Sequence, residues 1–270
     1  MDENSVKVTY NAELIKRVIE DGRRASGNTG IVNGVSTGFY DLDYMTAGFQ
    51  KGDLILLSGR MGIGKTPLVL SIVDFILKEG KKVAYFSLSS TSKKIMTGLL
   101  SMNAGVKVWD ISNGTVKEND MEKLKNGAKV LEKLPLHIED ELYTTASDIR
   151  SMCRLLKGMS GLDLIVIDGL QYVASPIHIL KKIAVEMECP ILMVSTLAQY
   201  DDSNDNRRPD ITDLRETDRD ALYSDVIMLL HKVDDEEYDL IIAKNRSRRE
   251  GVVKLRPHLE YSKFNNYKSR

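Results

Sequence analysis

A short glycine-rich segment has the residue types and the spacing needed to hold a phosphate chain. Gly59, Gly64, Lys65 and Thr66 fit the pattern G-x-x-x-x-G-K-[ST], and Gly62 adds a glycine inside it. Glycines let backbone N–H groups turn inward around a phosphate, the lysine reaches the β- and γ-phosphate oxygens, and the threonine hydroxyl is a Mg²⁺ ligand. The segment therefore predicts a site for ATP. The residues expected to bind the nucleotide are Gly59, Gly62, Gly64, Lys65, Thr66 and Pro67.

The elements on either side of this segment are those that such a site needs. Residues 53–58 read DLILLS, an apolar run typical of a strand buried on both faces. The helix predicted over 66–78 directs its positive N-terminal end at the same anion. Pro67 is tolerated there, because N–H groups in the first helical turn have no partner within the helix. This context favours a nucleotide site over a chance glycine turn.

A carboxylate that could complete the Mg²⁺ site follows another apolar run. Asp168 ends the segment LDLIVID, which predicts a strand. The carboxyl ends of parallel strands form the edge at which open α/β sheets bind ligands. We therefore predict Thr66 and Asp168 as the Mg²⁺ ligands, although Asp168 followed by Gly169 could also simply begin a turn.

Strand and helix patterns alternate along the chain, which predicts βαβ crossovers and a doubly wound, mostly parallel sheet flanked by helices. A short amphipathic helix is predicted over 11–24, before the glycines that precede residue 34. We expect a linker segment over 1–33 and one α/β domain over 34–270. The expected strands are 53–58, 82–88, 136–139, 162–168, 191–195, 226–231 and 240–243, the last two as a hairpin-like edge. The expected helices after residue 66 include 146–156, capped by Thr144 or Thr145, and one through 183–187.

Composition excludes several classes of protein. The net charge of −1 does not indicate a general nucleic-acid binder, although local basic runs such as Lys81-Lys82 are present. The two cysteines suit a reducing cytoplasm and argue against a disulfide framework. No apolar run approaches the roughly 20 residues that cross a bilayer, so no membrane association is expected. We expect Trp109, the single tryptophan, to be a packing residue.

Beyond these motifs, the sequence resembles the RecA-like ATPase domain of DnaB-type replicative DNA helicases. The resemblance begins with GVSTGFYDLDYMTAGFQKGDLILLSGR and continues through VAYFSL, LIVIDGLQ, RRPDITDLRET and IIAKNRSRREGVVKL. It ends in EYSKFNNY and so covers nearly all of residues 34–267. The separate N-terminal domain of the family has no counterpart in the sequence, which we expect to be a fragment or a natural short relative.

The resemblance implies a hexameric ring with ATP between subunits and single-stranded DNA in its centre. Lys244 and Arg246 match the family's K-x-R pair, which acts on a neighbour's γ-phosphate, so both join Lys65 and Asp168 as expected catalytic residues. The helix over 11–24 resembles the linker that docks on an adjacent subunit. Arg207 and Arg208 end the second expected DNA loop and are the predicted DNA-binding residues.

The sequence departs from the family pattern at four places, all of them at positions that the resemblance assigns to ATP hydrolysis or to DNA contact. Ser89 stands where the family has the glutamate that acts as catalytic base, and serine cannot carry that negative charge. Thr196 replaces the γ-phosphate-sensing glutamine. The segment 171–190 is short and lacks a basic loop, and 200–208 is acidic before its two arginines. These departures predict nucleotide binding with slow or absent turnover.

Three interpretations remain open from the sequence. The first is an ATP-binding, DnaB-like helicase core that acts on single-stranded DNA as a ring. The second is a catalytically impaired relative that binds nucleotide and regulates or loads a replicative helicase. The third, a RecA- or KaiC-like ATPase, shares the phosphate-binding segment but fits the DLRET and KNR segments less well.

Overall fold

The apolar runs of the sequence form one sheet in the computed structural model, which describes residues 15–16, 19, 32–141, 144–197, 207–214, 222–246 and 248–267. Within these residues the sheet has nine strands in the order β3-β2-β4-β5-β1-β6-β7-β8-β9. The strands from β3 to β6 in this order are parallel, and β7, β8 and β9 are antiparallel. The strands are β1 (Leu54–Gly59), β2 (Val83–Ser87), β3 (Leu136–Glu139), β4 (Leu164–Asp168), β5 (Ile191–Thr196), β6 (Val226–Lys232), β7 (Tyr238–Asn245), β8 (Gly251–His258) and β9 (Lys263–Asn266).

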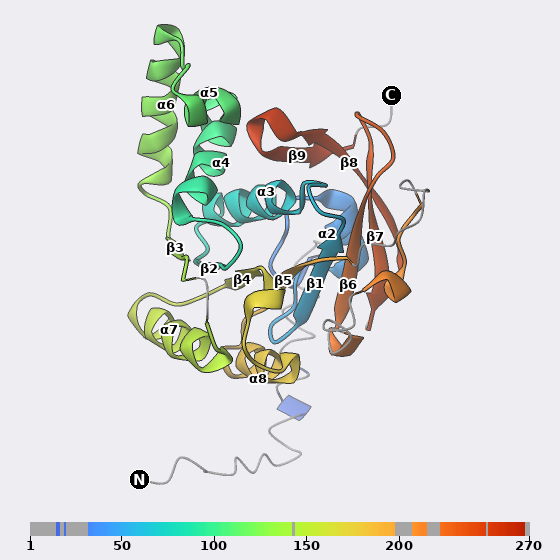
Figure 1. The fold of residues 1–270 in the computed structure, drawn as a ribbon. Helices are drawn as coiled ribbons and strands as arrows, with labels where there is room; N and C mark the ends of the chain where they lie inside the picture. Colours follow the sequence, from blue (N-terminus) through green and yellow to red (C-terminus); the bar gives the residue numbers. More distant parts are fainter. Residues whose placement is uncertain are drawn as a thin grey trace.

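Helices cover both faces of the parallel part of the sheet, as Figure 1 shows, with α3 and α4 on one side and α7 and α8 on the other. This arrangement confirms the predicted doubly wound α/β fold. The helices are α2 (Tyr40–Thr46), α3 (Lys65–Lys78), α4 (Ser92–Ala104), α5 (Val108–Asn113), α6 (Glu118–Leu131), α7 (Ala146–Met159) and α8 (Ile177–Glu186), with short 3-10 turns η1 (Leu170–Tyr172), η2 (Ile211–Asp213) and η4 (Leu259–Tyr261).

Successive side chains of the central strands point to opposite faces of the sheet, so the core consists of two layers. In β1, Ile55 and Leu57 pack with the residues of α3 and α4, whereas Leu54 and Leu56 pack with those of α7 and α8. Every residue of β1 is buried, because helices cover the strand on both faces. The continuous apolar run of the sequence is explained by this two-sided burial.

Thr145 caps helix α7, as one of the two predicted alternatives. Its hydroxyl accepts a hydrogen bond from the Asp148 N–H, and the Asp148 carboxylate accepts one from the Thr145 N–H. This reciprocal pair satisfies two N–H groups that the helix itself leaves unpaired.

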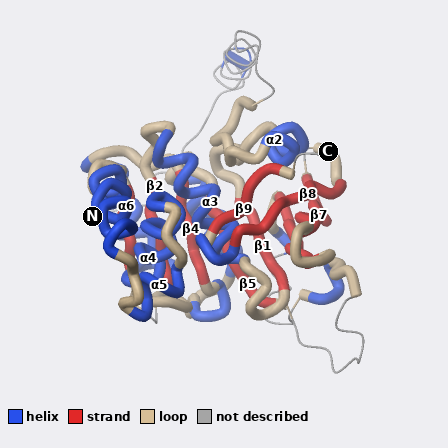
Figure 2. Tube along the Cα trace, turned by 90° about the horizontal axis from the view of Figure 1, so that it is seen from above, coloured by secondary structure: helices blue, strands red, loops and turns tan. Residues whose placement is uncertain are grey.

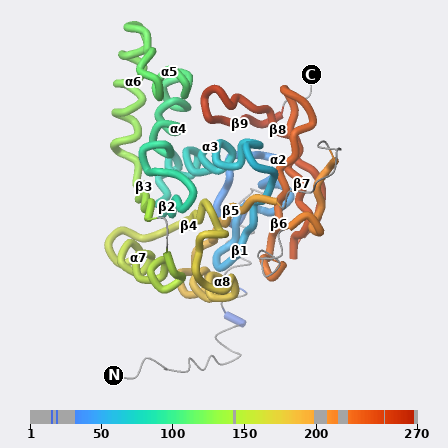
Figure 3. The backbone as a smooth tube through the Cα atoms, viewed as in Figure 1, coloured from blue at the N-terminus to red at the C-terminus, as the bar shows by residue number. Residues whose placement is uncertain are grey.

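The C-terminal part of the chain differs from the prediction. β7 is not an edge strand, because β8 and β9 extend the sheet beyond it. The hairpin of β8 and β9 bends over α3, as the tube views from above (Figure 2) and from the side (Figure 3) show. The Phe264 N–H donates to the hydroxyl of Ser71 in α3 at 2.9 Å, and this bond joins the two elements.

One further expectation is made more precise, one is corrected and one lies mostly outside the described residues. Helix α8 extends over Ile177–Glu186, whereas the sequence predicts only that a helix passes through 183–187. The Trp109 side chain is 74% exposed and so does not pack in the core of this chain. Of the helix predicted over 11–24, only Ile15, Lys16 and Ile19 are described, and all three are helical and exposed.

Candidate functional site

The phosphate-binding segment connects the C-terminal end of β1 to the first turn of α3. Gly62 and Gly64 have φ values of 75° and 103°, which favour glycine. Gly64 is the N-cap of α3, and the first turn of that helix contains no acidic residue. No acidic side chain therefore opposes an anion at this helix N-terminus, which attracts anions through the positive end of the helix dipole. We call the phosphate-binding segment, residues 59–66, the cradle. The Lys65 ammonium donates to the carbonyls of Gly59 and Arg60, at the start of the cradle, at 2.9 and 2.8 Å.

The two predicted Mg²⁺ ligands are in direct contact. The Thr66 hydroxyl donates to Asp168 Oδ2 at 2.9 Å, although the residues are 102 positions apart. Parallel pairing of β1 with β5, and of β5 with β4, brings the end of β4 beside the cradle. A hydroxyl and a carboxylate next to a phosphate site form a donor set that suits Mg²⁺, which binds through one or two protein oxygens together with phosphates and water.

Asp168 is almost fully buried, and its surroundings affect its charge in two directions. Burial raises the pKa of this carboxyl above its ordinary value. Hydrogen bonds from Tyr85 and Thr66, the nearby charge of Lys65 and the Ser89 hydroxyl act against that rise. The ionised form that a metal requires is therefore stabilised by specific polar groups and not by water.

Ser89 and Thr196 both lie beside the cradle. The Ser89 N–H donates to the backbone carbonyl of Asp168 at 3.2 Å, and the Ser89 side chain is exposed. Thr196 pairs with Gly59 across the β1–β5 ladder, and so lies at the start of the phosphate-binding segment. The departures at these two positions are therefore departures inside the candidate nucleotide site.

The predicted first DNA loop is short in the structure. Only residues 173–176 connect η1 to α8, so the chain passes from the end of β4 to the next helix without an extended loop. The second predicted loop, 200–208, lies outside the described residues except for Arg207 and Arg208.

Arg207 and Arg208 lie at the same edge of the sheet as the cradle, and each is paired with a carboxylate. Arg207 forms an ion pair with the buried Asp213, and its carbonyl accepts a hydrogen bond from Arg60 at 3.3 Å. Arg208 forms an ion pair with Asp239 at 3.1 Å. Both side chains stay about half exposed, but part of their charge is neutralised within the chain.

Lys244 and Arg246 lie at the opposite edge of the sheet from the cradle. Val226 pairs with Ile55 near the start of β1, and Asn245 pairs with Val226 in turn. The cradle begins at Gly59, at the other end of β1. At about 3.3 Å per residue, the length of this strand separates the two regions by roughly 17 Å. The structure therefore does not bring these two residues together with Lys65 and Asp168 in one chain.

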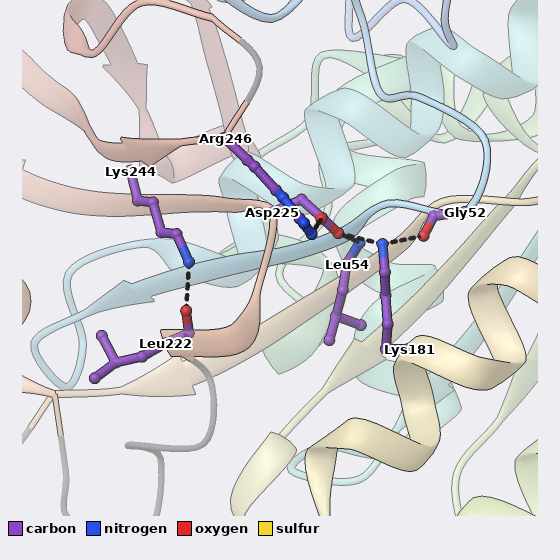
Figure 4. Close-up of polar contacts among 7 residues, drawn as sticks. All are labelled: Gly52, Leu54, Lys181, Leu222, Asp225, Lys244 and Arg246. Carbon is purple, nitrogen blue, oxygen red and sulfur yellow. Dashed lines mark hydrogen bonds and ion pairs between the residues drawn. The ribbon is translucent and has the colours of Figure 1, made fainter.

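A buried carboxylate holds Arg246 at this edge, as Figure 4 shows. Asp225 Oδ1 lies 3.4 Å from the Arg246 guanidinium, and Oδ2 accepts hydrogen bonds from Lys181 at 2.5 Å and from the Leu54 N–H at 2.9 Å. Burial alone would raise the pKa of Asp225, but these donors outweigh it and lower the pKa. The Arg246 side chain is nevertheless 72% exposed, so its end is accessible from outside the chain. Lys244 donates to the carbonyl of Leu222.

Sequence reasoning missed three residues of these two regions. Tyr85 donates its hydroxyl to Asp168, while Asp225 and Lys181 position Arg246. A polar hydroxyl in the otherwise apolar run VAYF was a signal for Tyr85. Asp225 and Lys181 meet only through the fold, and their sequence positions give no such signal.

Two classes of site are not found in the described part of the chain. Those residues contain no group of three or more His, Cys, Asp or Glu that could hold a metal ion. Among the same residues, no helix has the length and apolarity that a membrane span requires.

Comparison with known proteins identifies relatives over almost the whole chain. The sequence profile of the DnaB-like helicase C terminal domain matches residues 34–266. The replicative DNA helicase DnaB of Geobacillus stearothermophilus is 32% identical over an alignment of 264 positions, gaps included, which covers 89% of this chain and 58% of that protein. The replicative DNA helicase DnaC of Bacillus subtilis (strain 168) is 32% identical over an alignment of 283 positions, gaps included, which covers 96% of this chain and 62% of that protein. The chain thus spans about three fifths of these curated relatives.

Solved structures show the same fold. One of them, described as an ATPase domain, superimposes with a TM-score of 0.86 and 25% identity, covering 99% of this chain and 100% of that one. A DnaB-like replicative helicase, described with its interactions with primase, superimposes with a TM-score of 0.82 and 24% identity over 97% of this chain and 68% of that one.

Proposed function

The chain belongs to the family of DnaB-like helicase C-terminal domains, and we propose that it is the ATP-binding core of a replicative helicase that acts on single-stranded DNA as a ring. One observation supports the proposed ring. The cradle lies at the C-terminal end of β1, and the pair Lys244/Arg246 lies beside the N-terminal end of the same strand. An arginine there can act on a nucleotide only in another copy of the chain. A ring places the Lys244/Arg246 edge of each copy against the cradle of the next.

Each residue of the cradle has a defined role in this proposal. The N–H groups of the turn and the N-terminus of α3 bind the phosphates, and Lys65 leaves its two carbonyl partners to neutralise the β- and γ-phosphate oxygens. Thr66 and Asp168 hold Mg²⁺, which when bound offsets the negative charge of the phosphate oxygens. Arg246 of the adjacent copy would stabilise charge that develops on the γ-phosphate during transfer.

DNA binding by this core is proposed to be weak. Arg207 and Arg208 are the candidate contacts, but each already neutralises a carboxylate of the same chain. Affinity for a phosphate backbone depends on the number of cations that are available to replace counterions. The short connection after η1 also supplies no second basic loop.

A second candidate function is favoured by Ser89. This exposed side chain adjoins Asp168, and its hydroxyl cannot act as a carboxylate base for the attacking water. A relative that binds Mg²⁺ and ATP without hydrolysing it would serve as a regulatory or loading subunit for an active helicase. In either case, we expect ATP to be bound and turnover to be slow.

Phosphate release measured for the wild type, Ser89→Glu and Lys65→Ala, with and without single-stranded DNA, tests the proposal. Wild-type turnover is expected close to that of Lys65→Ala, and Ser89→Glu is expected to raise it at least tenfold, since a positioned base contributes roughly 10²–10⁴-fold. Because Ser89 is exposed, a glutamate can be accommodated without entering the core. Fast, DNA-stimulated turnover by the wild type would contradict the slow turnover expected here and would exclude the impaired relative. Failure of the wild type to bind ATP would contradict both functions.

A further inference from the structure

Tyr85 is a tyrosine whose hydroxyl lies inside the core of the protein. It belongs to β2, its exposed fraction is 0%, and its ring packs in the same core layer as α3. The hydroxyl donates to Asp168 Oδ2 at 2.8 Å. A buried hydroxyl needs a partner, and here the partner is the carboxylate that ends the neighbouring strand.

The same carboxylate oxygen also receives the hydroxyl of Thr66, at 2.9 Å. The two donors differ in what they do when Mg²⁺ and nucleotide bind. Thr66 is itself a proposed metal ligand, so its hydroxyl oxygen is required by the metal. Tyr85 is on strand β2 and is not part of the phosphate-binding turn. Its hydrogen bond to Asp168 can therefore persist both before and after Mg²⁺ and nucleotide bind.

Burial makes this second donor important. Asp168 is surrounded by core residues, and a buried carboxylate is stable in its ionised form only when fixed donors replace water. Hydrogen bonds to a charged acceptor are also directional, so the donor restricts rotation of the carboxylate.

We propose that Tyr85 is a positioning residue for magnesium, whose hydroxyl orients the Asp168 carboxylate and thereby sets the affinity of the nucleotide site for Mg²⁺. The inference rests on the proposed role of Asp168 as a Mg²⁺ ligand and deepens it. A tyrosine that served the fold alone would contribute to stability and leave the metal dependence of nucleotide binding unchanged.

Tyr85→Phe removes only the hydroxyl and keeps the ring in the core. Tyr238→Phe is the matched control, since Tyr238 is also a buried core tyrosine, and it packs edge-on against Phe264 at 5.3 Å and not against Asp168. The measurement is the binding of a fluorescent ATP analogue, first in EDTA and then as Mg²⁺ is titrated. We expect Tyr85→Phe to match the wild type in EDTA and to need about three- to tenfold more Mg²⁺ for half-maximal enhancement, as for one lost hydrogen bond. Tyr238→Phe should need the wild-type concentration.

A double-mutant cycle with Asp168→Asn tests whether Tyr85 acts through this carboxylate. The effect of Tyr85→Phe on the Mg²⁺ midpoint should disappear in the Asp168→Asn background, whereas an effect that persists there overturns the proposal. A wild-type Mg²⁺ midpoint in Tyr85→Phe overturns it also, as does a loss of binding in EDTA confined to this variant, which would assign the hydroxyl to the fold. If the wild type itself binds no analogue under any condition, the proposed function fails as well.

Discussion

In the candidate nucleotide site, polar groups converge on Asp168, a buried carboxylate that is surrounded by hydroxyl donors. Thr66 and Tyr85 contact one of its oxygens, and Ser89 adjoins it where a second carboxylate is expected from the family resemblance. Two carboxylates so close together would repel each other and raise each other's pKa. With serine at this position the site avoids that repulsion and keeps one carboxylate for Mg²⁺, but it lacks a base. This explains why nucleotide binding and slow turnover are expected together.

Asp53 gives the protein a pH-dependent contribution to stability. Its pKa is raised to about 6, first by burial and then by the nearby charge of Asp225, against an ordinary value of 3.8. The folded state therefore holds this proton more tightly than the unfolded chain. The stabilisation is fully present below pH 3.8 and is lost as the pH rises through about 6.

Asp53→Asn should therefore be more stable than the wild type at pH 7.5, because it removes a carboxylate whose ionised form is unfavourable in the folded state. We expect the melting temperature to rise by roughly 2–4 °C, or about 1 kcal/mol after allowance for solvent screening. The difference should shrink as the pH falls from 7.5 to 5. Thermal unfolding across this range checks it, and a difference that grows toward low pH would show that the sign is wrong.

At the residue scale, the sequence predicts groups whose relation is local. Gly64, Lys65 and Thr66 are contiguous, so their chemistry can be read from spacing. Tyr85 meets Asp168 only because β2 and β4 pair in parallel, and this contact requires the sheet. Trp109 was predicted wrongly, since an aromatic residue in a helical pattern gives no indication of which side faces solvent.

At the scale of elements, the C-terminal hairpin supports the cradle. β9 packs on α3 through Phe264, whose N–H bonds to Ser71. A Cβ placed on Gly64 would lie 3.1 Å from Leu259 Cδ2 and 3.3 Å from Phe264 Cε2. Leu259 and Phe264 therefore form a wall against the first turn of α3, and the shape of that turn depends on residues far from it in the sequence.

Gly64→Ala tests this coupling. The substitution combines a φ of 103° with the two close contacts, so we expect a loss of about 2–3 kcal/mol in unfolding free energy together with weaker ATP binding. Gly105→Ala is the control, because Gly105 has a φ of 65° and an added Cβ there meets nothing. It should cost about 1 kcal/mol and leave ATP binding unchanged. Denaturant unfolding and an ATP titration give both values, and equal losses for the two variants would exclude the wall.

Among the strands, some can be predicted from the sequence pattern alone and others cannot. β1, β2, β4 and β5 were predicted because two-sided burial demands continuous apolar runs. β8 and β9 were missed, since β9 reads KFNN and only Phe264 of its residues is buried. A four-residue strand with one apolar side chain is stabilised by its neighbours in the sheet and on α3, and this information is absent from local sequence.

At the scale of the whole molecule, the length of β1 separates the cradle from Lys244 and Arg246, which we propose to act on the nucleotide of a neighbouring copy. The cradle is at the C-terminal end of β1, and Arg246 is held by Asp225 at the other end of the same strand. A molecule with complementary half-sites on opposite edges can associate head to tail, and such association closes into a ring when the rotation permits. ATP bound between copies should stabilise that contact.

Arg246→Ala is therefore expected to leave ATP binding by dilute, monomeric chains unchanged and to reduce the ATP-dependent increase in mass at high concentration. Light scattering with and without Mg²⁺ and ATP measures this. Arg256→Ala is a suitable control, since Arg256 is a half-exposed arginine on β8 with an ion pair at 3.7 Å. Weaker ATP binding by monomeric Arg246→Ala would contradict the account, because it would place the arginine at its own cradle.

The central claim, that this chain binds ATP in the cradle between β1 and α3, is tested most directly by calorimetric titration of Mg²⁺ and ATP into the wild type, Lys65→Ala and Lys78→Ala. Lys78 is in the last turn of the same helix and pairs with Asp74, so it controls for loss of a charge on α3. We predict that the wild type and Lys78→Ala bind with the same affinity, and that Lys65→Ala binds about 10–100-fold more weakly, as for a lost charge-assisted hydrogen bond. Equal affinity of Lys65→Ala and the wild type would contradict the account.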